Sequence, residues 1–273
     1  MSVDENLKKL FSLEGKVILM TGAAGGIGAA LSRGMAGIGA TMCNCDLSEK
    51  GLKALESDIR AEGGQARSYL MDVTDLESIC KAVDAVAAEF GRIDVLVNVA
   101  GINKREGLLD VKESTYDKIM DINLKGVFFV SQAVAKHMIK RHSGNIINIG
   151  SHNATAMLGG CSVYGATKSG VVALTRSMAV EWAEWGIRAN AVSPGHILTP
   201  LTQVTWDHPT RGDYLRDRIA MRRPGTPEEL VGLVAMLASD ASVYMTGANY
   251  VIDGGCLCGG MPWDFDSAYR NKE

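Results

Sequence analysis

The sequence predicts an α/β fold, a doubly wound seven-stranded parallel sheet with helices on both faces. Apolar, β-leaning segments alternate with longer helical segments along the whole 273-residue chain, which is typical of repeated β-α-β units. Several apolar segments are short continuous runs, as expected for parallel strands that helices cover on both sides. The first of these runs leads directly into a glycine-rich turn, which is a common feature of ligand-binding α/β folds.

The predicted elements follow this alternation from end to end. Strands are expected at residues 16–20, 41–46, 66–72, 94–98, 145–151, 188–193 and 249–253. Helices are expected at residues 27–38, 48–62, 75–90, 115–141, 163–184 and 227–238. Capping residues mark two helix starts, Thr74-Asp75 and Thr226-Pro227-Glu228.

One segment interrupts the rhythm. Residues 195–225 are long, mixed and punctuated by proline, and in a compact domain such a segment is more often a substrate-covering loop than a disordered insert. We therefore expect a single domain over residues 1–273, with a substrate loop at about 195–225 and a C-terminal tail at 256–273.

Composition argues against several classes of protein. The formal net charge is −3, so the chain has no strongly basic character of the kind that nucleic-acid binding requires. The hydrophobic content of 47% and charged content of 22% are ordinary for a globular protein. No apolar stretch reaches the length of a membrane span, and no leader-like run follows the start. The expectation is a cytoplasmic protein with neither nucleic-acid nor membrane partners.

The six cysteines are expected to be free thiols. Cys43 and Cys45 would share one face of a strand, and Cys80 and Cys161 resemble small buried hydrophobic residues. The remaining two form a C-x-C pair at residues 256–258. None has the spacing of a structural zinc site, and the expected compartment keeps thiols reduced. No metal is therefore expected.

The glycine-rich turn has the chemistry of a phosphate-binding site. Residues 21–28 (TGAAGGIG) hold four glycines between a strand and a helix, where glycine permits unusual backbone angles and leaves helix N-terminal N–H groups free for phosphate. Asp46 lies 20 residues after Gly26, at the end of the second strand. There a carboxylate can accept hydrogen bonds from a ribose and repel a 2′-phosphate, which favours NAD over NADP. Asp46 can also cap the helix near Ser48, and the two roles are compatible.

An ordered set of motifs carries a resemblance to a known family. The motifs are T-G-x-x-x-G-x-G at 21–28, Asn-Val-Ala-Gly at 98–101, Asn123, Ser151 and Tyr164-x-x-x-Lys168, supported by Asp72-Val73, Pro194-Gly195 and Asp253-Gly254-Gly255. Together they resemble the short-chain dehydrogenase/reductase family, over about residues 12–255, and this resemblance implies a Rossmann fold. Val99 is a departure, because the family usually has asparagine there.

The resemblance implies hydride transfer between a secondary alcohol or ketone and a nicotinamide. Tyr164 would be the general base or acid, and Lys168, one helical turn away, would lower the tyrosine pKa and hold the nicotinamide ribose. Ser151 would orient the substrate oxygen. Asn123 would anchor a water that links Lys168 to solvent.

The resemblance also assigns the cofactor contacts, with NAD as the expected cofactor. The predicted contacts are Thr21, Gly22, Gly26, Ile27, Gly28, Asp46, Asp72, Val73, Asn98, Ala100, Gly101, Tyr164, Lys168, Pro194, Gly195, Ile197 and Thr199.

The substrate pocket is expected from residues 102–107, 151–161 and 195–225. Their predicted substrate contacts are Lys104, Arg105, Ser151, Asn153 and His196, with His152, Trp206, His208 and Arg211 in the same segments. Such a polar lining suits a sugar, sugar acid or polyol, as in gluconate 5-dehydrogenase-like relatives, with Lys104 or Arg105 contacting a carboxylate. A solvated basic pair is the simpler reading of Lys104-Arg105.

Two alternatives stay open. The chain also resembles 3-oxoacyl-carrier-protein reductases, and a non-catalytic NAD(H)-binding sensor or scaffold can use the same fold. Hydrolase and metalloenzyme readings are weaker, because Ser151 has no G-x-S-x-G setting and the histidines lack ligand spacing. By resemblance, the long helices predict a homotetramer.

Overall fold

The structure is a computed structural model that describes residues 3–259. The predicted C-terminal tail at 256–273 therefore lies outside the described residues beyond residue 259.

Seven parallel strands form one sheet, which confirms the predicted fold class. The spatial order is β3-β2-β1-β4-β5-β6-β7, so the chain builds outward from β1 in one direction and then from β4 in the other. The strands are β1 (Val17–Thr21), β2 (Thr41–Asp46), β3 (Gln65–Leu70), β4 (Val95–Asn98), β5 (Gly144–Ile149), β6 (Ile187–Pro194) and β7 (Asn249–Ile252). The reversal between β1 and β4 is the point where such sheets open a crevice at their carboxyl edge.

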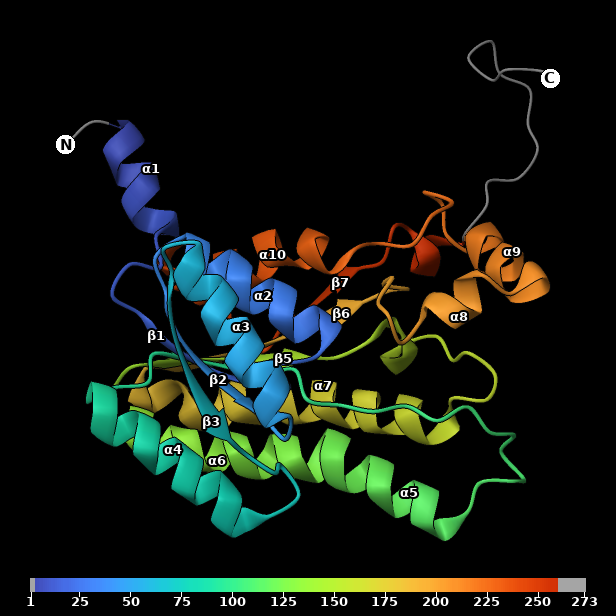
Figure 1. Ribbon diagram of the computed structural model, residues 1–273, viewed down its shortest axis with the longest axis horizontal. Coiled ribbons are helices and arrows are strands. Elements are labelled where there is room, and N and C mark those ends of the chain that lie inside the picture. Colours follow the sequence, from blue (N-terminus) through green and yellow to red (C-terminus); the bar gives the residue numbers. More distant parts are fainter. Residues whose placement is uncertain (1–2, 260–273) are drawn as a thin grey trace.

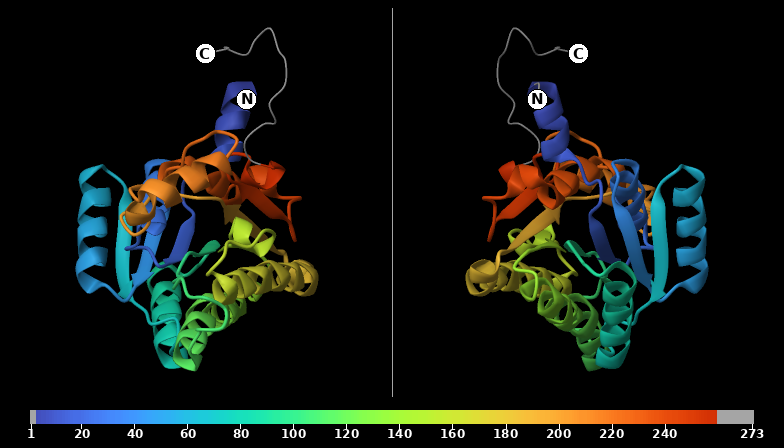
Figure 2. Two further views of the ribbon diagram at one scale, coloured as in Figure 1. Left: turned by 90° about the vertical axis from the view of Figure 1, so that its right-hand side faces the viewer. Right: turned by 90° about the vertical axis from the view of Figure 1, so that its left-hand side faces the viewer.

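Helices cover both faces of this sheet (Figures 1 and 2). One layer holds α2 (Gly26–Gly37), α3 (Glu49–Ala61) and α10 (Val231–Ala238). The opposite layer holds α4 (Leu76–Phe90), α5 (Glu113–Met120), α6 (Gly126–Ile139) and α7 (Ser162–Trp182). Each layer packs on its own apolar cluster, so the doubly wound arrangement follows from two buried sheet faces.

The strand β1 shows why the apolar runs are continuous. Val17 and Leu19 point into the cluster under α4, α6 and α7, whereas Ile18 and Met20 point into the cluster under α2, α3 and α10. All four side chains are buried. A strand covered on both sides needs apolar residues at every position, because successive side chains alternate between the faces.

The predicted helix at 115–141 exists with an irregular centre. It starts at Glu113 with α5, passes through a π-helical turn over Asp121–Lys125, and continues as α6. The π turn carries Asn123, and such insertions often mark functional positions.

The predicted capping residues confirm two helix starts. The Asp75 side chain accepts a hydrogen bond from the Glu77 amide at the start of α4. Thr226 and Glu229 form a reciprocal capping box on the 3₁₀ turn Pro227–Leu230 that leads into α10.

Some structure was not anticipated. A helix α1 (Val3–Phe11) precedes β1 and projects from the body of the molecule (Figures 1 and 2). The segment 195–225 contains two short helices, α8 (Gln203–Trp206) and α9 (Pro209–Asp217), and is not a plain loop.

The cysteines are free, and one of them corrects an expectation. Cys43 and Cys45 are buried on one face of β2, as predicted, and Cys161 is buried as well. Cys80, however, is exposed on α4. It falls on the outer side of an amphipathic helix whose buried positions are Ile79, Ala82, Val83 and Val86. Within residues 3–259, no helix is both long enough and apolar enough to cross a bilayer.

Candidate active site

Two adjoining cavities open at the carboxyl edge of the sheet. The larger cavity, about 580 Å³, lies over the ends of β1, β2 and β3. The smaller cavity, about 250 Å³, lies over the ends of β5 and β6 and under the 195–225 segment. They share several lining residues, among them Ile27, Gly101 and Thr199, so the two volumes form one continuous site.

The glycine-rich turn forms the floor of the larger cavity. Gly22 has φ +66°, and a Cβ there would lie 2.7 Å from the backbone of Ala100 on the neighbouring loop. At Gly28 a Cβ would lie 2.2 Å from the Gly22 carbonyl oxygen. No side chain caps α2, whose N-cap residue is Gly25, so its first N–H groups remain available to an anion. These features fit a diphosphate.

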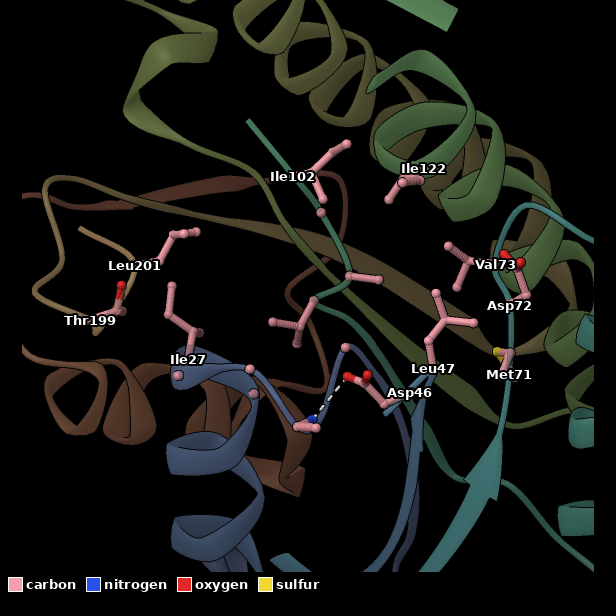
Figure 3. A pocket seen from close by; sticks show the side chains of 18 of the residues that line it. Ile27, Asp46, Leu47, Met71, Asp72, Val73, Ile102, Ile122, Thr199 and Leu201 are labelled. Atoms are coloured by element: carbon pink, nitrogen blue, oxygen red, sulfur yellow. Dashed lines mark hydrogen bonds between the residues drawn. The ribbon is translucent and has the colours of Figure 1, made fainter. Parts of the chain in front are cut away.

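Asp46 and the glycine turn are held together on one side of this cavity (Figure 3). The Asp46 Oδ2 accepts a hydrogen bond from the Ala24 amide at 3.0 Å, and Oδ1 accepts one from the Ser48 amide at 3.0 Å. Ser48 in turn caps α3. Asp46 therefore holds the backbone of two turns through Ala24 and Ser48 and also lines the cavity.

The larger cavity has an acidic and apolar wall. Its two charged lining residues are Asp46 and Asp72. The Asp72 Oδ1 accepts hydrogen bonds from the Thr74 amide at 2.8 Å and from the Thr74 hydroxyl at 2.7 Å. None of the residues lining this cavity in the described chain is basic.

Most of the predicted cofactor residues line one cavity or both. The larger cavity has Gly22, Gly26, Ile27, Gly28, Asp46, Asp72, Val73, Ala100, Gly101 and Thr199. The smaller one has Tyr164, Lys168, Pro194, Gly195 and Ile197.

Two predicted cofactor residues lie behind the walls. The Asn98 amide is buried and donates to Ser131 at 2.9 Å and to Asn148 at 2.8 Å, which ties β4 to α6 and β5. The Thr21 hydroxyl accepts hydrogen bonds from the Val99 and Ala100 amides at 3.2 and 3.3 Å. Both side chains shape the edge of the sheet and lie outside the cavity lining.

Sequence reasoning missed part of both linings. The additional residues are Ala24, Gly25, Leu47, Met71, Ile122 and Pro200 in the larger cavity, Asn103, Ile149, Gly150, Leu158, Cys161, Thr202 and Leu215 in the smaller one, and Val99, Ile102 and Leu201 in both. Leu47 and Met71 directly follow β2 and β3, and that position was a usable signal. Of the others, Ile122 lies in the π turn and Leu215 on α9, and most of the rest lie in turns and loops.

Tyr164 and Lys168 lie one turn apart on α7, as predicted. The Lys168 Nζ is 5.7 Å from the centre of the Tyr164 ring. Lys168 is 4% exposed, and its Nζ donates a hydrogen bond to the Ile149 carbonyl oxygen at 2.7 Å. Burial lowers the pKa of Lys168 from 10.5 to about 8.

The pKa of Tyr164 departs from expectation. Burial raises it above its ordinary value, the hydrogen bond with the Ser151 side chain opposes that rise, and Cys161 adds to it. Lys168 is not among the groups that shift this pKa, so its lowering effect stays a prediction. Burial dominates because it disfavours the ionised form of the tyrosine.

Ser151 lies two residues after the end of β5 and caps a tight 3₁₀ turn, His152–Ala154. Its hydroxyl accepts a hydrogen bond from the Asn153 amide at 3.1 Å, and its carbonyl accepts one from the Ala154 amide at 2.9 Å. The Ser169 hydroxyl donates to the Ala154 carbonyl at 3.1 Å, which fastens the turn to α7. Ser151, His152 and Asn153 all line the smaller cavity and are all buried.

The Asn123 side chain, on the π turn, holds the backbone of Ile102 in place. Its Oδ1 accepts a hydrogen bond from the Ile102 amide and its Nδ2 donates to the Ile102 carbonyl, both at 2.8 Å. Nδ2 also donates to Thr167 at 3.3 Å. A Cβ on Gly101 would lie 3.4 Å from Asn123 Oδ1 and 3.6 Å from Lys168 Nζ, so a glycine separates the two groups.

The basic pair Lys104-Arg105 divides. Arg105 lines the smaller cavity, and its Nη1 donates to the Thr205 hydroxyl at 3.3 Å. Lys104 is exposed, pairs with Glu106 at 2.5 Å and lies outside both linings.

Two histidines form another wall. His152 and His196 pack edge to face with ring centres 4.6 Å apart, and His196 packs on Trp206 at 6.1 Å. Burial lowers the pKa of both; that of His196 falls to about 4, with His152 and Arg105 adding to the effect. Both are therefore neutral at physiological pH.

The 195–225 segment is fixed over the smaller cavity. Its ends pair as the Gly225 amide donates to the His196 carbonyl at 3.0 Å and the Leu198 amide donates to the Gly225 carbonyl at 2.8 Å. Trp206 and Leu215 of α8 and α9 line the cavity and form an apolar cluster with Ile219. His208 instead caps α9. Residues of this segment therefore form part of the wall of the smaller cavity, and its role as a substrate loop stays a prediction.

No group of three or more metal-ligating side chains occurs among residues 3–259. The site is built from a tyrosine, a lysine, a serine and a glycine turn.

Comparison with known proteins agrees with this geometry. A family model described as enoyl-(acyl carrier protein) reductase matches residues 22–256. The D-threitol dehydrogenase of Mycolicibacterium smegmatis is 42% identical over 90% of this chain and 94% of its own length. A 3-oxoacyl-[acyl-carrier-protein] reductase of Thermotoga maritima is also 42% identical, over 90% of this chain and 99% of its own.

A solved structure is similar to this chain in its fold. The gluconate 5-dehydrogenase of Burkholderia cenocepacia, in complex with NADP and tartrate, has a TM-score of 0.89 at 38% identity, covering 92% of this chain and 99% of that chain. The resemblance seen in the motifs is confirmed: the chain belongs to the short-chain dehydrogenase/reductase family.

Proposed function

We propose that this oxidoreductase transfers a hydride between NAD(H) and a secondary alcohol or ketone of the polar sugar, sugar-acid or polyol class, with Tyr164 as general base and acid. The observation that carries the proposal is the meeting of Ser151, Tyr164 and Lys168 in the smaller cavity, directly beside the glycine-lined larger one. The intact set weighs against a non-catalytic sensor, which has no need of a proton-transfer group.

The residues divide the chemistry between them. A bound nicotinamide supplies or accepts the hydride. In the oxidative direction, Tyr164 as phenolate takes the hydroxyl proton while the substrate carbon loses its hydride; in the reductive direction, Tyr164 returns the proton. Ser151 hydrogen-bonds the reacting oxygen, and the ammonium of Lys168 favours the phenolate once both groups share a site closed to water. Asn123 holds the Ile102 backbone in register and, as the resemblance implies, anchors a water on the proton path.

The charge of the larger cavity supports NAD over NADP. Asp46 accepts the Ala24 amide at the cavity wall, and the described lining offers no cation to a 2′-phosphate. A phosphate near Asp46 would meet like charge without compensation. The Burkholderia relative was solved with NADP. The preference for NAD is therefore argued from the residues of this chain, and it needs a direct binding test.

The smaller cavity supports a short polar substrate. Arg105, His152, Asn153 and His196 line it, and the 195–225 segment covers it. Similar proteins include a D-threitol dehydrogenase, a 2-dehydro-3-deoxy-D-gluconate 5-dehydrogenase and a 3-oxoacyl-[acyl-carrier-protein] reductase. The polar lining suits a polyol or sugar acid better than an alkyl chain.

The test is a two-cofactor substrate panel. Polyols, aldonates, ketoses and an acetoacetyl thioester are offered with NAD(H) and NADP(H) in parallel, and reduced-nicotinamide absorbance is followed. We expect turnover of a polyol or aldonate with NAD, and a loss of at least about a hundredfold in Tyr164→Phe with NADH binding retained. Full activity of Tyr164→Phe would refute the role of Tyr164, and exclusive use of the thioester would favour the acyl reductase.

We further propose a homotetramer, on the exposed apolar surface of α5, α6 and α7. A groove there is lined by Met120, Leu124, Phe128, Phe129 and Leu174, and Phe128 is 41% exposed. Contiguous apolar surface of this kind is typical of subunit contacts. Light scattering that gives a monomer mass would refute it.

A further inference from the structure

The smaller cavity contains polar groups that proton transfer does not use. Ser151, His152 and Asn153 are consecutive, and all three line the cavity. Ser151 meets the reacting oxygen in the proposed function. His152 and Asn153 are 6% and 5% exposed, so each is a buried polar side chain beside the reacting atom.

The His152 ring presents a hydrogen-bond acceptor. Its Nδ1 lies 3.2 Å from the Pro194 carbonyl oxygen, which can only accept, so Nδ1 carries the proton of the neutral ring. The neutral state follows from burial, which lowers the His152 pKa. Nε2 then carries the lone pair of the ring.

Asn153 is also incompletely satisfied. Its Oδ1 is buried and has no hydrogen-bond partner among the described residues. The side chain lines the cavity, and the oxygen and nitrogen of an amide can exchange places by rotation, so either group can meet a ligand. A buried amide oxygen without a partner costs free energy that a ligand hydroxyl can recover.

The position of these groups is fixed by the turn. The Asn153 amide donates to the Ser151 hydroxyl, the Ala154 amide to the Ser151 carbonyl, and Ser169 holds the Ala154 carbonyl. His152 is fastened to the end of β6 through Pro194 and packs on His196. The reacting-oxygen site and the two polar groups therefore form one rigid cluster.

Resting on the proposed function, we infer that His152 and Asn153 recognise a hydroxyl on the carbon next to the reacting one, so that the enzyme selects vicinal diols and α-hydroxy ketones over simple alcohols and ketones. A hydroxyl both donates and accepts, and it satisfies an imidazole lone pair or either end of an amide. A methylene at the same place, as in a 3-oxoacyl chain, leaves the Asn153 oxygen unpaired and offers no donor to the His152 lone pair. Sites built to bond a hydroxyl reject analogues that lack it.

The inference is tested with two ketones that differ by one hydroxyl. The reduction of 1-hydroxybutan-2-one and of butan-2-one is followed by loss of NADH absorbance in the wild-type enzyme, His152→Phe, Asn153→Leu and the control His137→Phe. His137 pairs with Asp84 on α6 and α4, outside both cavity linings, so the control removes a histidine without touching the site.

The expected result is a wild-type preference for the hydroxy ketone in kcat/KM of roughly tenfold to a hundredfold. His152→Phe and Asn153→Leu should each lower the ratio of kcat/KM for the hydroxy ketone to kcat/KM for butan-2-one, by roughly tenfold. A wild-type circular-dichroism spectrum and NADH binding show that the variants are folded. His137→Phe should keep the wild-type preference.

Equal kcat/KM for the two ketones in the wild type, or an unchanged preference in both variants, would overturn the inference and leave the proposed function standing. An absence of any Tyr164-dependent turnover of alcohols and ketones would overturn the proposed function and the inference together.

Discussion

The Lys168 ammonium donates to the Ile149 carbonyl oxygen at 2.7 Å, which joins α7 to the end of β5 inside the protein. A single carbonyl is weak compensation for a buried charge, and the pKa of Lys168 accordingly falls from 10.5 to about 8. The shift corresponds to about 3 kcal/mol of destabilisation by the charged lysine at neutral pH.

This cost predicts how stability responds to Lys168→Met. The folded pKa lies below the unfolded one, so the penalty is fully present below pH 8 and is relieved as the pH rises toward 10.5. The variant should therefore unfold at a higher urea concentration than wild type at pH 7. Its unfolding free energy should be larger by about 1–3 kcal/mol, because the lost hydrogen bond offsets part of the gain. The difference should shrink between pH 8 and 10. A difference that does not change with pH would contradict the buried charge.

Asp46→Asn should weaken the choice of cofactor. The substitution keeps the shape of the side chain and one acceptor oxygen for the Ala24 amide, but it removes the charge that repels a 2′-phosphate. We expect the ratio of NAD to NADP affinity, measured by fluorescence titration, to fall by roughly tenfold or more. Wild-type enzyme that binds the two cofactors equally would show that Asp46 does not discriminate.

Arg105→Ala should separate acidic from neutral substrates. Arg105 lines the smaller cavity whereas Lys104 lies outside it, paired with Glu106. If Arg105 binds a carboxylate, the KM of the best aldonate should rise roughly tenfold to a hundredfold, while that of a neutral polyol changes little. Lys104→Ala is the matched control and should leave both unchanged. An unaltered aldonate KM in Arg105→Ala would rule out this contact.

Gly22→Ala should damage the floor of the larger cavity. The residue has φ +66°, and the new Cβ would lie 2.7 Å from the Ala100 backbone. The left-handed conformation alone costs about 1–2 kcal/mol for alanine, and the contact adds to it. Lower unfolding free energy and weaker NADH binding are expected. Gly37→Ala at the end of α2, where a Cβ meets nothing within 4 Å, should be neutral or slightly stabilising.

The fold was largely predictable, because its signals are local. Continuous apolar runs, such as residues 17–20, indicate that both faces of the sheet are buried. The capping residues Asp75 and Thr226 mark helix starts. The exceptions have local causes as well. Cys80 looked apolar but falls on the outer side of α4, and the short helices α8 and α9 were hidden in a segment of mixed composition.

By itself the sequence determined the family, the glycine turn with its acid at Asp46, and the spacing of Ser151, Tyr164 and Lys168. These depend on residue type and order, and parallel strands deliver them to a common edge. Only the tertiary structure decided that Arg105 enters the cavity while Lys104 does not, that Asn98 braces strands behind the wall, and that burial raises the Tyr164 pKa. Those outcomes depend on which groups meet across the fold and how completely water is excluded, and no spacing along the chain encodes that directly.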